Sequence, residues 1–336
     1  MAGEAELEQV VGRRPGAIML KSIGSLDEHC ERLLACSPFA MVGTTTAEGS
    51  LTTIALGGEP GFLAPRSEAV LELGDLAGRQ LVDGAPAGLI ALVPGYGETL
   101  RINGRIRVEG GAVTLDVEEA LLHCAKAIMR SGLWIEPAAE PSTTPVDEGS
   151  PSLGVFLAGA PFVVLASTDG DGHADVSPRG DPPGLVRQLD EVTIAIADRP
   201  GNHRTDTLHN LVADPRVALL ALRPGSDEVA EVRGAARVCT DRALLESMRI
   251  RNRTPKVAIL IDVEHGEVRT EPALAAADLW NPSRHVAEGA LPRAATIWAD
   301  HVRRNTDPST GAKVARRLVS ERALAAGVAL DYRRNL

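Results

Sequence analysis

The sequence predicts a mainly β protein with peripheral helices (α+β), built from two similar antiparallel barrels in tandem and followed by a helical tail. Three observations carry this prediction: the sequence repeats itself once at long range, its apolar runs are short, and turn residues separate these runs. Several short strands at this spacing favour a small antiparallel barrel over a sheet of βαβ units. The length of 336 residues also exceeds what one hydrophobic core usually supports.

The repeat can be followed residue by residue. Three segments correspond without internal gaps: 37–84 with 160–207, 94–104 with 224–234, and 116–134 with 262–280. A solenoid would repeat every few tens of residues, so this long period indicates duplication of a whole domain.

The expected elements follow the same order in both copies. In the first copy we expect a helix at 26–36, with Ser25 and Glu28 as a capping box, and strands at 39–45, 50–56, 69–73, 88–93 and 99–108. In the second copy we expect strands at 162–167, 174–177, 193–197, 217–222 and 229–238, with a helix at 206–212.

These elements divide the chain into four parts. The first barrel spans 1–137, a linker rich in Pro, Ala, Ser and Thr spans 138–151, the second barrel spans 152–290, and a helical extension spans 291–336. The apolar spacing after Trp280 is helical, and we expect these helices to pack on the outside of the second barrel.

Net charge, the N-terminal residues and the cysteine spacing limit the classes of partner and the cellular location that we expect. A net charge of −10 argues against nucleic-acid and membrane-surface binding, so we expect a small-molecule substrate. Glu4, Glu6 and Glu8 stand where a signal peptide would be apolar, which favours a cytoplasmic location. The four cysteines lack paired spacing, and neither His29-Cys30 nor His123-Cys124 has a second ligand pair, so we expect reduced thiols and no metal.

Two segments of the second copy combine shape-fixing Gly and Pro with hydrogen-bond donors. They read DVSPRGDPPG at 175–184 and DRPGNHRTDT at 198–207, and the second leads directly into a predicted helix. Backbone N–H groups at a helix start and arginine side chains both direct donors at a phosphate. Each charge-assisted bond is worth roughly 1.5 to 3 kcal/mol, so Arg199 and Arg204 are expected to anchor a phosphorylated ligand.

The first copy has lost this pattern and kept another. Leu76 and Leu81 stand at the positions of Arg199 and Arg204, whereas GETLRING at 97–104 and HCAKAIMRS at 123–131 are retained. If 123–131 is helical, Lys126 and Arg130 lie on one face with His123 one turn earlier. The motifs thus predict one anion site between the barrels, with one half contributing each side.

With the halves overlaid, these motifs resemble the pyridoxamine 5′-phosphate oxidase-like superfamily of flavin-binding split barrels, from about residue 21 to 280. The resemblance implies two six-stranded split barrels that form an intramolecular pseudo-dimer, in a monomer or homodimer of the whole chain. Family members bind FMN, or in some branches a deazaflavin coenzyme, between barrels. Because SPRGDPPG is lost from 54–61 and HCAKAxxRS from 269–277, we expect one flavin per chain.

The resemblance also implies roles for particular residues. The ribityl phosphate is assigned to Arg199, Asn202, Arg204 and Thr207, and the flavin ring to Ser177, Arg179 and Gly180. The opposite side is assigned to Lys126, Arg130, Ser131 and Trp134, with Glu98, Arg101 and Asn103 nearby. The candidates for substrate orientation, charge stabilisation or proton transfer are His123, Cys124, Lys126 and Arg130.

The expected function is therefore an FMN-dependent oxidoreductase acting on a small organic molecule. A different class stays open: a non-catalytic flavin, deazaflavin or haem-binding protein of the same fold, for which His123, His173, His203 and His209 are the candidate haem ligands. No nucleophile-elbow or dinucleotide-binding fingerprint is present.

Overall fold

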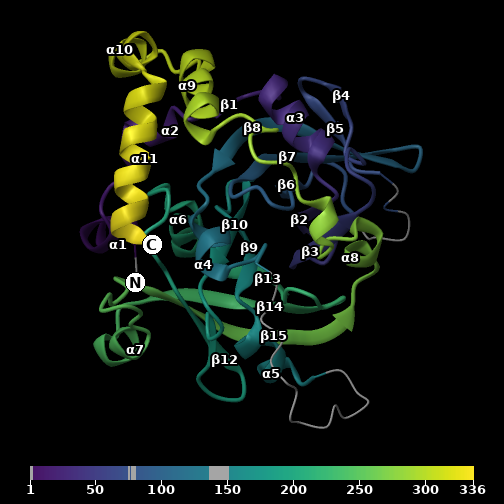
Figure 1. Ribbon diagram of the computed structural model, residues 1–336. Helices are drawn as coiled ribbons and strands as arrows, with labels where there is room; N and C mark the ends of the chain where they lie inside the picture. Colours follow the sequence, from purple (N-terminus) through teal and green to yellow (C-terminus); the bar gives the residue numbers. More distant parts are fainter. Residues whose placement is uncertain (1–2, 75, 77–80, 136–150) are drawn as a thin grey trace.

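The computed structural model describes residues 3–74, 76, 81–135 and 151–336 of the chain. These residues form two antiparallel sheets flanked by short helices, with three further helices at the C-terminal end (Figure 1). The linker predicted at 138–151 lies outside the described residues, apart from Pro151. No helix in the described ranges combines the length and the apolar character needed to cross a lipid bilayer.

Each half of the chain contributes one sheet. The first sheet consists of β1 (Ser22–Ile23), β2 (Phe39–Thr45), β3 (Leu51–Gly57), β4 (Pro65–Ser67), β5 (Val70–Glu72), β6 (Pro86–Leu92), β7 (Thr99–Glu109) and β8 (Ala112–His123). The second consists of β9 (Phe162–Thr168), β10 (Ala174–Gly180), β11 (Val186–Gln188), β12 (Thr193–Ala197), β13 (Arg216–Leu222), β14 (Glu228–Cys239) and β15 (Ala258–Thr270).

The two sheets have the same topology, which confirms the predicted pair of like halves. The strand order is β3-β2-β6-β7-β8-β5-β4 in one and β10-β9-β13-β14-β15-β12-β11 in the other, with β1 added beside β8. Both carry a bulge at the same place, before Gly104 and before Gly234. A Cβ atom on either glycine would come within 1.8 or 2.0 Å of a carbonyl oxygen on the neighbouring strand, so only glycine fits there.

The strand count differs from the predicted six per barrel. The sheets have eight and seven strands, because the long strands β8 and β15 and the short strands β1, β4 and β11 were not predicted. Charged residues interrupt both long strands, such as Asp116 and Glu118 in the middle of β8, which weakens the apolar signal of a strand. Each path of strands ends without closing into a ring, as in a split barrel.

The helices are short and lie mostly between strands. They are α1 (Glu4–Val11), α2 (Gly16–Met19), α3 (Glu28–Cys36), α4 (Lys126–Ser131), α5 (Leu153–Gly159), α6 (Asp206–Ala213), α7 (Arg242–Ser247), α8 (Pro272–Ala277), the 3₁₀ turn η1 (Pro282–Arg284), α9 (Ala294–Arg304), α10 (Thr310–Leu318) and α11 (Glu321–Asn335). The predicted cap of the first long helix was wrong. Asp27, not Ser25, caps α3 by accepting the N–H groups of His29 and Cys30.

Three apolar clusters hold the fold together. One lies within each half, and a third joins the halves through residues such as Phe39 and Met41 of β2 and Phe162 and Val164 of β9. Alternate residues of β2, Ala40 and Val42, face the core of their own half instead. Both faces of these strands are therefore buried, which explains their unbroken apolar runs.

The two halves also pack through reciprocal helix contacts. Gly180 of β10 lies against Ala127 of α4 from the other half, and Gly57 of β3 lies against Ala273 of α8 in the equivalent way. A Cβ atom on Gly180 would be 1.9 Å from the Ala127 carbonyl oxygen, and one on Gly57 would be 1.8 Å from that of Ala273. The halves thus form a pseudo-symmetric pair within one chain.

The terminal helices exchange sides. Leu7 of α1 is buried in the core of the second half, whereas Ile297 and Trp298 of α9 are buried in that of the first. The prediction that the tail packs on the second barrel was therefore wrong. Trp298 donates its indole N–H to Leu122 O at 2.9 Å, which holds α9 beside β8 of the first sheet (Figure 1).

Candidate functional site

A cavity of about 790 Å³ lies where the two halves meet. The first half lines it with the end of β8 and with α4, and the second half with β10, the loop at 198–205 and the segment 250–256. The volume is in the range typical of small-molecule and cofactor sites. The DRPGNHRTDT loop and the HCAKAIMRS segment, far apart in sequence, thus face one space.

Direct hydrogen bonds hold these two segments together. Lys126 donates from Nζ to Gly201 O at 2.9 Å, and Arg130 donates from Nη2 to Pro200 O at 2.7 Å. Both side chains start from α4, as expected. His123 does not share that helix, because it is the last residue of β8 and the helix begins at Lys126.

The SPRGDPPG segment continues β10 as far as Gly180, three residues beyond the strand predicted at 174–177. Ser177, Arg179 and Gly180 line the cavity from β10. Arg199 lines it too, but its guanidinium is already held by Asp181 at 2.5 Å and by Met248 O at 2.8 Å. Thr207 also has a partner, since its hydroxyl donates to Asp175 at 3.2 Å.

A buried ion network connects the halves behind the cavity. Arg101 of β7 is 1 % exposed and pairs with Asp175 and with Asp206, the latter at 2.6 Å. Arg204 binds Asp206 and Glu119, each at 2.7 Å. Burial alone would lower the pKa of Arg101, but the surrounding carboxylates raise it above its ordinary value, so this guanidinium is always charged.

The described lining of the cavity is strongly cationic. Three acidic side chains reach it: Asp181, Asp198 and Asp206. Nine cationic side chains reach it: Arg101, Lys126, Arg130, Arg179, Arg199, Arg204, Arg251, Arg253 and Lys256. This excess of positive charge occurs in a chain whose net charge is −10. Such local concentration is typical of a site for an anionic ligand.

Three arginines of the lining have unused donors. Arg101 Nε, Arg179 Nε and Arg204 Nη1 are buried and have no hydrogen-bond partner among the described residues. Buried donors are almost always satisfied, so unpartnered donors beside a cavity are typical of a site for a ligand with acceptor oxygens. Gly201 and Asn202 belong to the 198–205 loop, which also contains Arg204 and leads to the start of α6.

His123 offers a further donor, and its tautomer can be assigned. Asn202 accepts the N–H of Arg204 at its Oδ1, which turns its amide nitrogen toward His123 Nε2 at 3.1 Å. His123 Nε2 is therefore the acceptor, and Nδ1 carries the hydrogen. Burial, with the nearby Arg101, Arg179 and Arg204, lowers the pKa of His123 well below its usual range. The ring is thus neutral near pH 7, with an unpartnered Nδ1–H.

The remaining predicted residues fall into two groups. Cys124 lines the cavity, and burial raises the pKa of its thiol, which stays protonated. Four others are not part of the lining: Glu98, Asn103, Ser131 and Trp134. Asn103 instead binds Glu119 at 3.0 Å beside a second cavity of about 430 Å³, and Trp134 donates to Tyr96 O at 2.8 Å.

The site also contains residues that sequence reasoning missed. Arg251, Arg253 and Lys256 form an exposed rim of the cavity, and Asn335 reaches it from the end of α11. Arg253 donates to Asn335 Oδ1 at 3.1 Å, and Arg130 donates to Asn335 O at 2.7 Å. Three cations within six residues around Pro255 were the available signal for the rim.

The pseudo-symmetric position on the other side has different chemistry. Glu231 stands where Arg101 stands, and Arg269 stands where His123 stands. Arg269 is held by Glu231 at 3.4 Å and also pairs with Glu271. Pro272 replaces Lys126 at the start of the equivalent helix. The cationic lining is therefore present on one side of the pseudo-dimer.

A known family model matches the second half of the chain. Residues 152–278 match the family model described as pyridoxamine 5′-phosphate oxidase. The match includes β10, the 198–205 loop and α6, which supply one side of the cavity. The first half repeats the same strand order. A search of curated proteins found no match.

Three solved structures illustrate the similarity to shorter proteins. HupZ of Group A Streptococcus is 16 % identical, with a TM-score of 0.30, over 36 % of this chain and 94 % of its own. General stress protein 26 of Bacillus anthracis is 16 % identical, with a TM-score of 0.28, over 34 % and 89 %. An F420 reductase is 17 % identical, with a TM-score of 0.28, over 35 % and 98 %.

Proposed function

We propose that this chain, which has the pyridoxamine 5′-phosphate oxidase-like split-barrel fold, is a flavin-dependent oxidoreductase that holds one FMN in the cavity between its halves. The observation that carries the proposal is the group of three buried, unpartnered arginine donors, on Arg101, Arg179 and Arg204, at a cavity of cofactor size. The proposed substrate is a small organic molecule.

The residues present fit a phosphorylated flavin. A phosphate brings several acceptor oxygens, which suit Arg179 Nε and Arg204 Nη1. Arg179, which the resemblance assigns to the flavin ring, is here proposed to bind the phosphate instead. The 198–205 loop adds backbone N–H groups at the start of α6, where the helix dipole also favours an anion. Arg199 supports this wall through its bond to Asp181, and in this proposal it adds positive charge more than free donors.

Small uncharged residues of the lining suit the flavin ring. They are Ser177 and Gly180 of β10 and Ala127 of α4, and Gly180 packs against Ala127 beside the cationic residues. In the proposed complex, His123 donates its Nδ1–H to a ring acceptor or to the substrate. A neutral histidine at this point can orient a ligand, but it is not a proton source near pH 7.

FMN, when bound, supplies hydride or electron transfer, and the protein supplies position and electrostatics. Lys126 and Arg130 add positive charge on the α4 side, where it stabilises negative charge that develops during reduction. His123 and Cys124 add no charge to the site, because the lowered pKa of His123 and the raised pKa of Cys124 leave both side chains neutral. The exposed rim of Arg251, Arg253 and Lys256 favours a substrate that carries a carboxylate or phosphate.

One cofactor per chain is the proposed stoichiometry, because Glu231 and Arg269 replace Arg101 and His123 at the pseudo-symmetric position. The test is an absorption spectrum of the purified chain, followed by release and quantification of the chromophore. A flavin spectrum with one FMN per chain is expected. A haem or deazaflavin spectrum would replace the cofactor assignment, and two flavins per chain would contradict the single site.

Arg179→Gln provides the matched mutational test. Loss of one charge-assisted bond is worth about 1.5 to 3 kcal/mol, so FMN binding should weaken by roughly tenfold or more. Arg237→Gln on β14, whose partner Asp262 is exposed on the outside of the sheet, is the control and should bind FMN like the wild type. Equal FMN affinity in both variants would overturn the phosphate assignment.

A further inference from the structure

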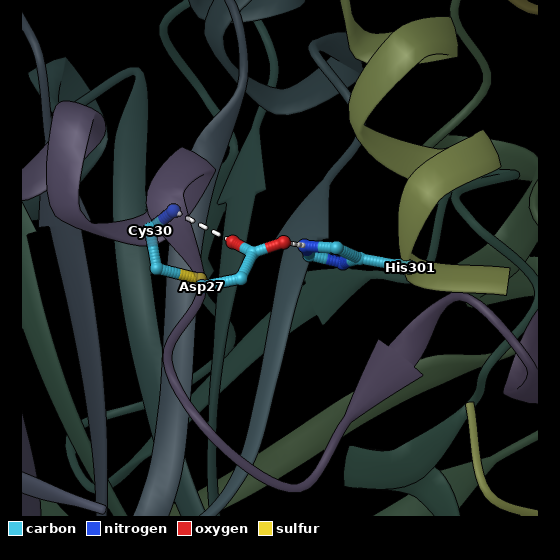
Figure 2. Close-up of side chains that lie close together, drawn as sticks. All are labelled: Asp27, Cys30 and His301. Carbon is cyan, nitrogen blue, oxygen red and sulfur yellow. Dashed lines mark hydrogen bonds and ion pairs between the residues drawn. The ribbon is translucent and has the colours of Figure 1, made fainter. Parts of the chain in front are cut away.

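A second group of polar side chains lies away from the cavity, where α3 meets α9. Asp27, Cys30 and His301 come from opposite ends of the sequence and are 4 %, 0 % and 0 % exposed. Figure 2 shows the Asp27 carboxylate between the other two side chains. The proposed flavin chemistry uses none of them.

Asp27 divides its two carboxylate oxygens between two tasks. Oδ1 accepts the backbone N–H groups of His29 and Cys30, each at 3.0 Å, and so caps α3. Oδ2 lies 3.4 Å from His301 Nε2. Asp27 Oδ2 does not take part in the cap and can bind a group located between α3 and α9.

His301 directs a lone pair at the same point. Its Nδ1 lies 3.1 Å from the carbonyl oxygen of Lys21, which can only accept, so Nδ1 carries the hydrogen. Nε2 is buried and has no hydrogen-bond partner among the described residues. In a neutral ring this nitrogen and Asp27 Oδ2 are two acceptors facing each other, an arrangement that needs a positive charge between them.

Cys30 completes the set. Asp27, Cys30 and His301 each offer one ligand atom, and these atoms lie within 4.8 Å of one another. Ligands around a tetrahedral zinc ion lie about 3.3 to 3.8 Å apart, given bonds of about 2.0 to 2.3 Å, so a small closure brings the three atoms into range. Burial raises the pKa of the Cys30 thiol, and a bound cation would displace its proton.

We propose that Asp27, Cys30 and His301 form a binding site for a divalent cation of the zinc class. Thiolate, imidazole and carboxylate are the zinc ligands found in proteins, and a ligating histidine usually donates its other N–H to a carbonyl, as His301 does to Lys21. The cation would tie α9, and through it the tail, to α3 of the first half. None of the three residues lines either of the two cavities described above, and we assign the cation a structural role.

A protonated His301 paired with Asp27 is the competing arrangement, and it binds no metal. Titration of the full chain, produced without a histidine tag, with Zn²⁺ and measurement of bound metal after gel filtration separates the two. One zinc per chain is expected in the wild type and its loss in Cys30→Ser. Cys36→Ser, on the same helix but outside the cluster, is the control and should retain the metal.

The cobalt form gives a readout that does not depend on a folded variant. Wild-type chain loaded with Co²⁺ should show the near-ultraviolet charge-transfer band of a thiolate ligand, read as a difference from the zinc form. Absence of bound zinc in the wild type, absence of this band, or equal zinc in Cys30→Ser would each overturn the proposal. None of these outcomes bears on FMN binding.

Discussion

Arg101 of β7 and Asp175 of β10 form an ion pair that is buried on both sides and joins the two halves of the chain. Arg101 also serves Asp206 and Glu119, so its removal leaves three carboxylates short of a partner. Their positions place this network directly behind the cavity.

Arg101→Met should therefore destabilise the protein by about 3 to 5 kcal/mol, the usual cost of leaving buried charges without a partner. Urea unfolding at pH 7 measures this. Arg107→Met is the control on the same strand, because Arg107 and its partner Asp116 are 42 % and 40 % exposed, and it should cost under about 1 kcal/mol. Adding Asp175→Asn to Arg101→Met should restore part of the loss. An unfolding curve of Arg101→Met that coincides with the wild type would contradict the network.

Gly180→Ala and Gly57→Ala form a matched pair across the pseudo-symmetry. Each added Cβ meets a helix carbonyl oxygen, so each should cost about 1 to 3 kcal/mol of stability. Only Gly180→Ala moves α4, and with it Lys126 and Arg130, so only this variant should also weaken FMN binding. Urea unfolding and flavin fluorescence titration measure the two effects.

Gly311→Ala in α10 is the control for both substitutions, since no atom lies within 4 Å of the added Cβ. It should unfold and bind FMN like the wild type. Equal losses of FMN affinity in Gly180→Ala and Gly57→Ala would contradict the proposal that FMN binds on the α4 side of the pseudo-dimer alone.

Glu98 should make stability depend on pH. Burial raises the pKa of its carboxyl group from 4.5 to about 7. The folded state thus keeps a proton that the unfolded state has released, so this group's contribution to stability is full below pH 4.5 and declines as pH rises to about 7. Glu98→Gln removes this decline. The free energy of unfolding of the variant, relative to that of the wild type, should therefore increase by about 2 to 3 kcal/mol as the pH rises from 4.5 to 8.

Urea unfolding of Glu98→Gln and wild type at a series of pH values tests this. Glu109→Gln, at the exposed end of β7, is the control and should follow the wild-type profile. A constant difference between Glu98→Gln and wild type across the series would mean that Glu98 is ionised in the folded state.

Asp331→Asn should loosen the tail. Asp331 of α11 binds Lys126 Nζ at 2.6 Å, and Lys126 is 1 % exposed whereas Asp331 is 36 % exposed. For such a half-exposed pair we expect a loss of about 1 to 2 kcal/mol and faster tryptic cleavage in α11. Glu288→Gln, an exposed carboxylate before α9, is the control. Unchanged cleavage in Asp331→Asn would show that this pair does not hold the helix.

Several elements could be predicted from the sequence because their signals are local. The strands Phe39–Thr45 and Thr193–Ala197 have the predicted bounds, since short apolar runs there end at turn residues. The long strands β8 and β15 were missed because charged residues interrupt their apolar runs, and the conformation of such segments depends on their position in the sheet. The cap of α3 was misplaced by two residues because Ser25 and Asp27 are both good caps, and only the fold selects between them.

The candidate site shows the same limit. The motifs identified Arg179, Arg204, Lys126 and Arg130, and all four line the cavity. They could not show that Arg199 and Thr207 are already bonded to Asp181 and Asp175. Those carboxylates belong to strand and loop positions whose side-chain directions are set by the sheet.

By itself, the sequence determined that the chain is a duplicated β unit and that each copy keeps a different part of one motif set, because both facts are recorded in residue identities along the chain. Only the tertiary structure decided which donors stay free for a ligand, which rim residues join them, and where the tail packs. Those outcomes depend on distances between residues that lie far apart in sequence, and such distances arise when two buried strand faces pack together.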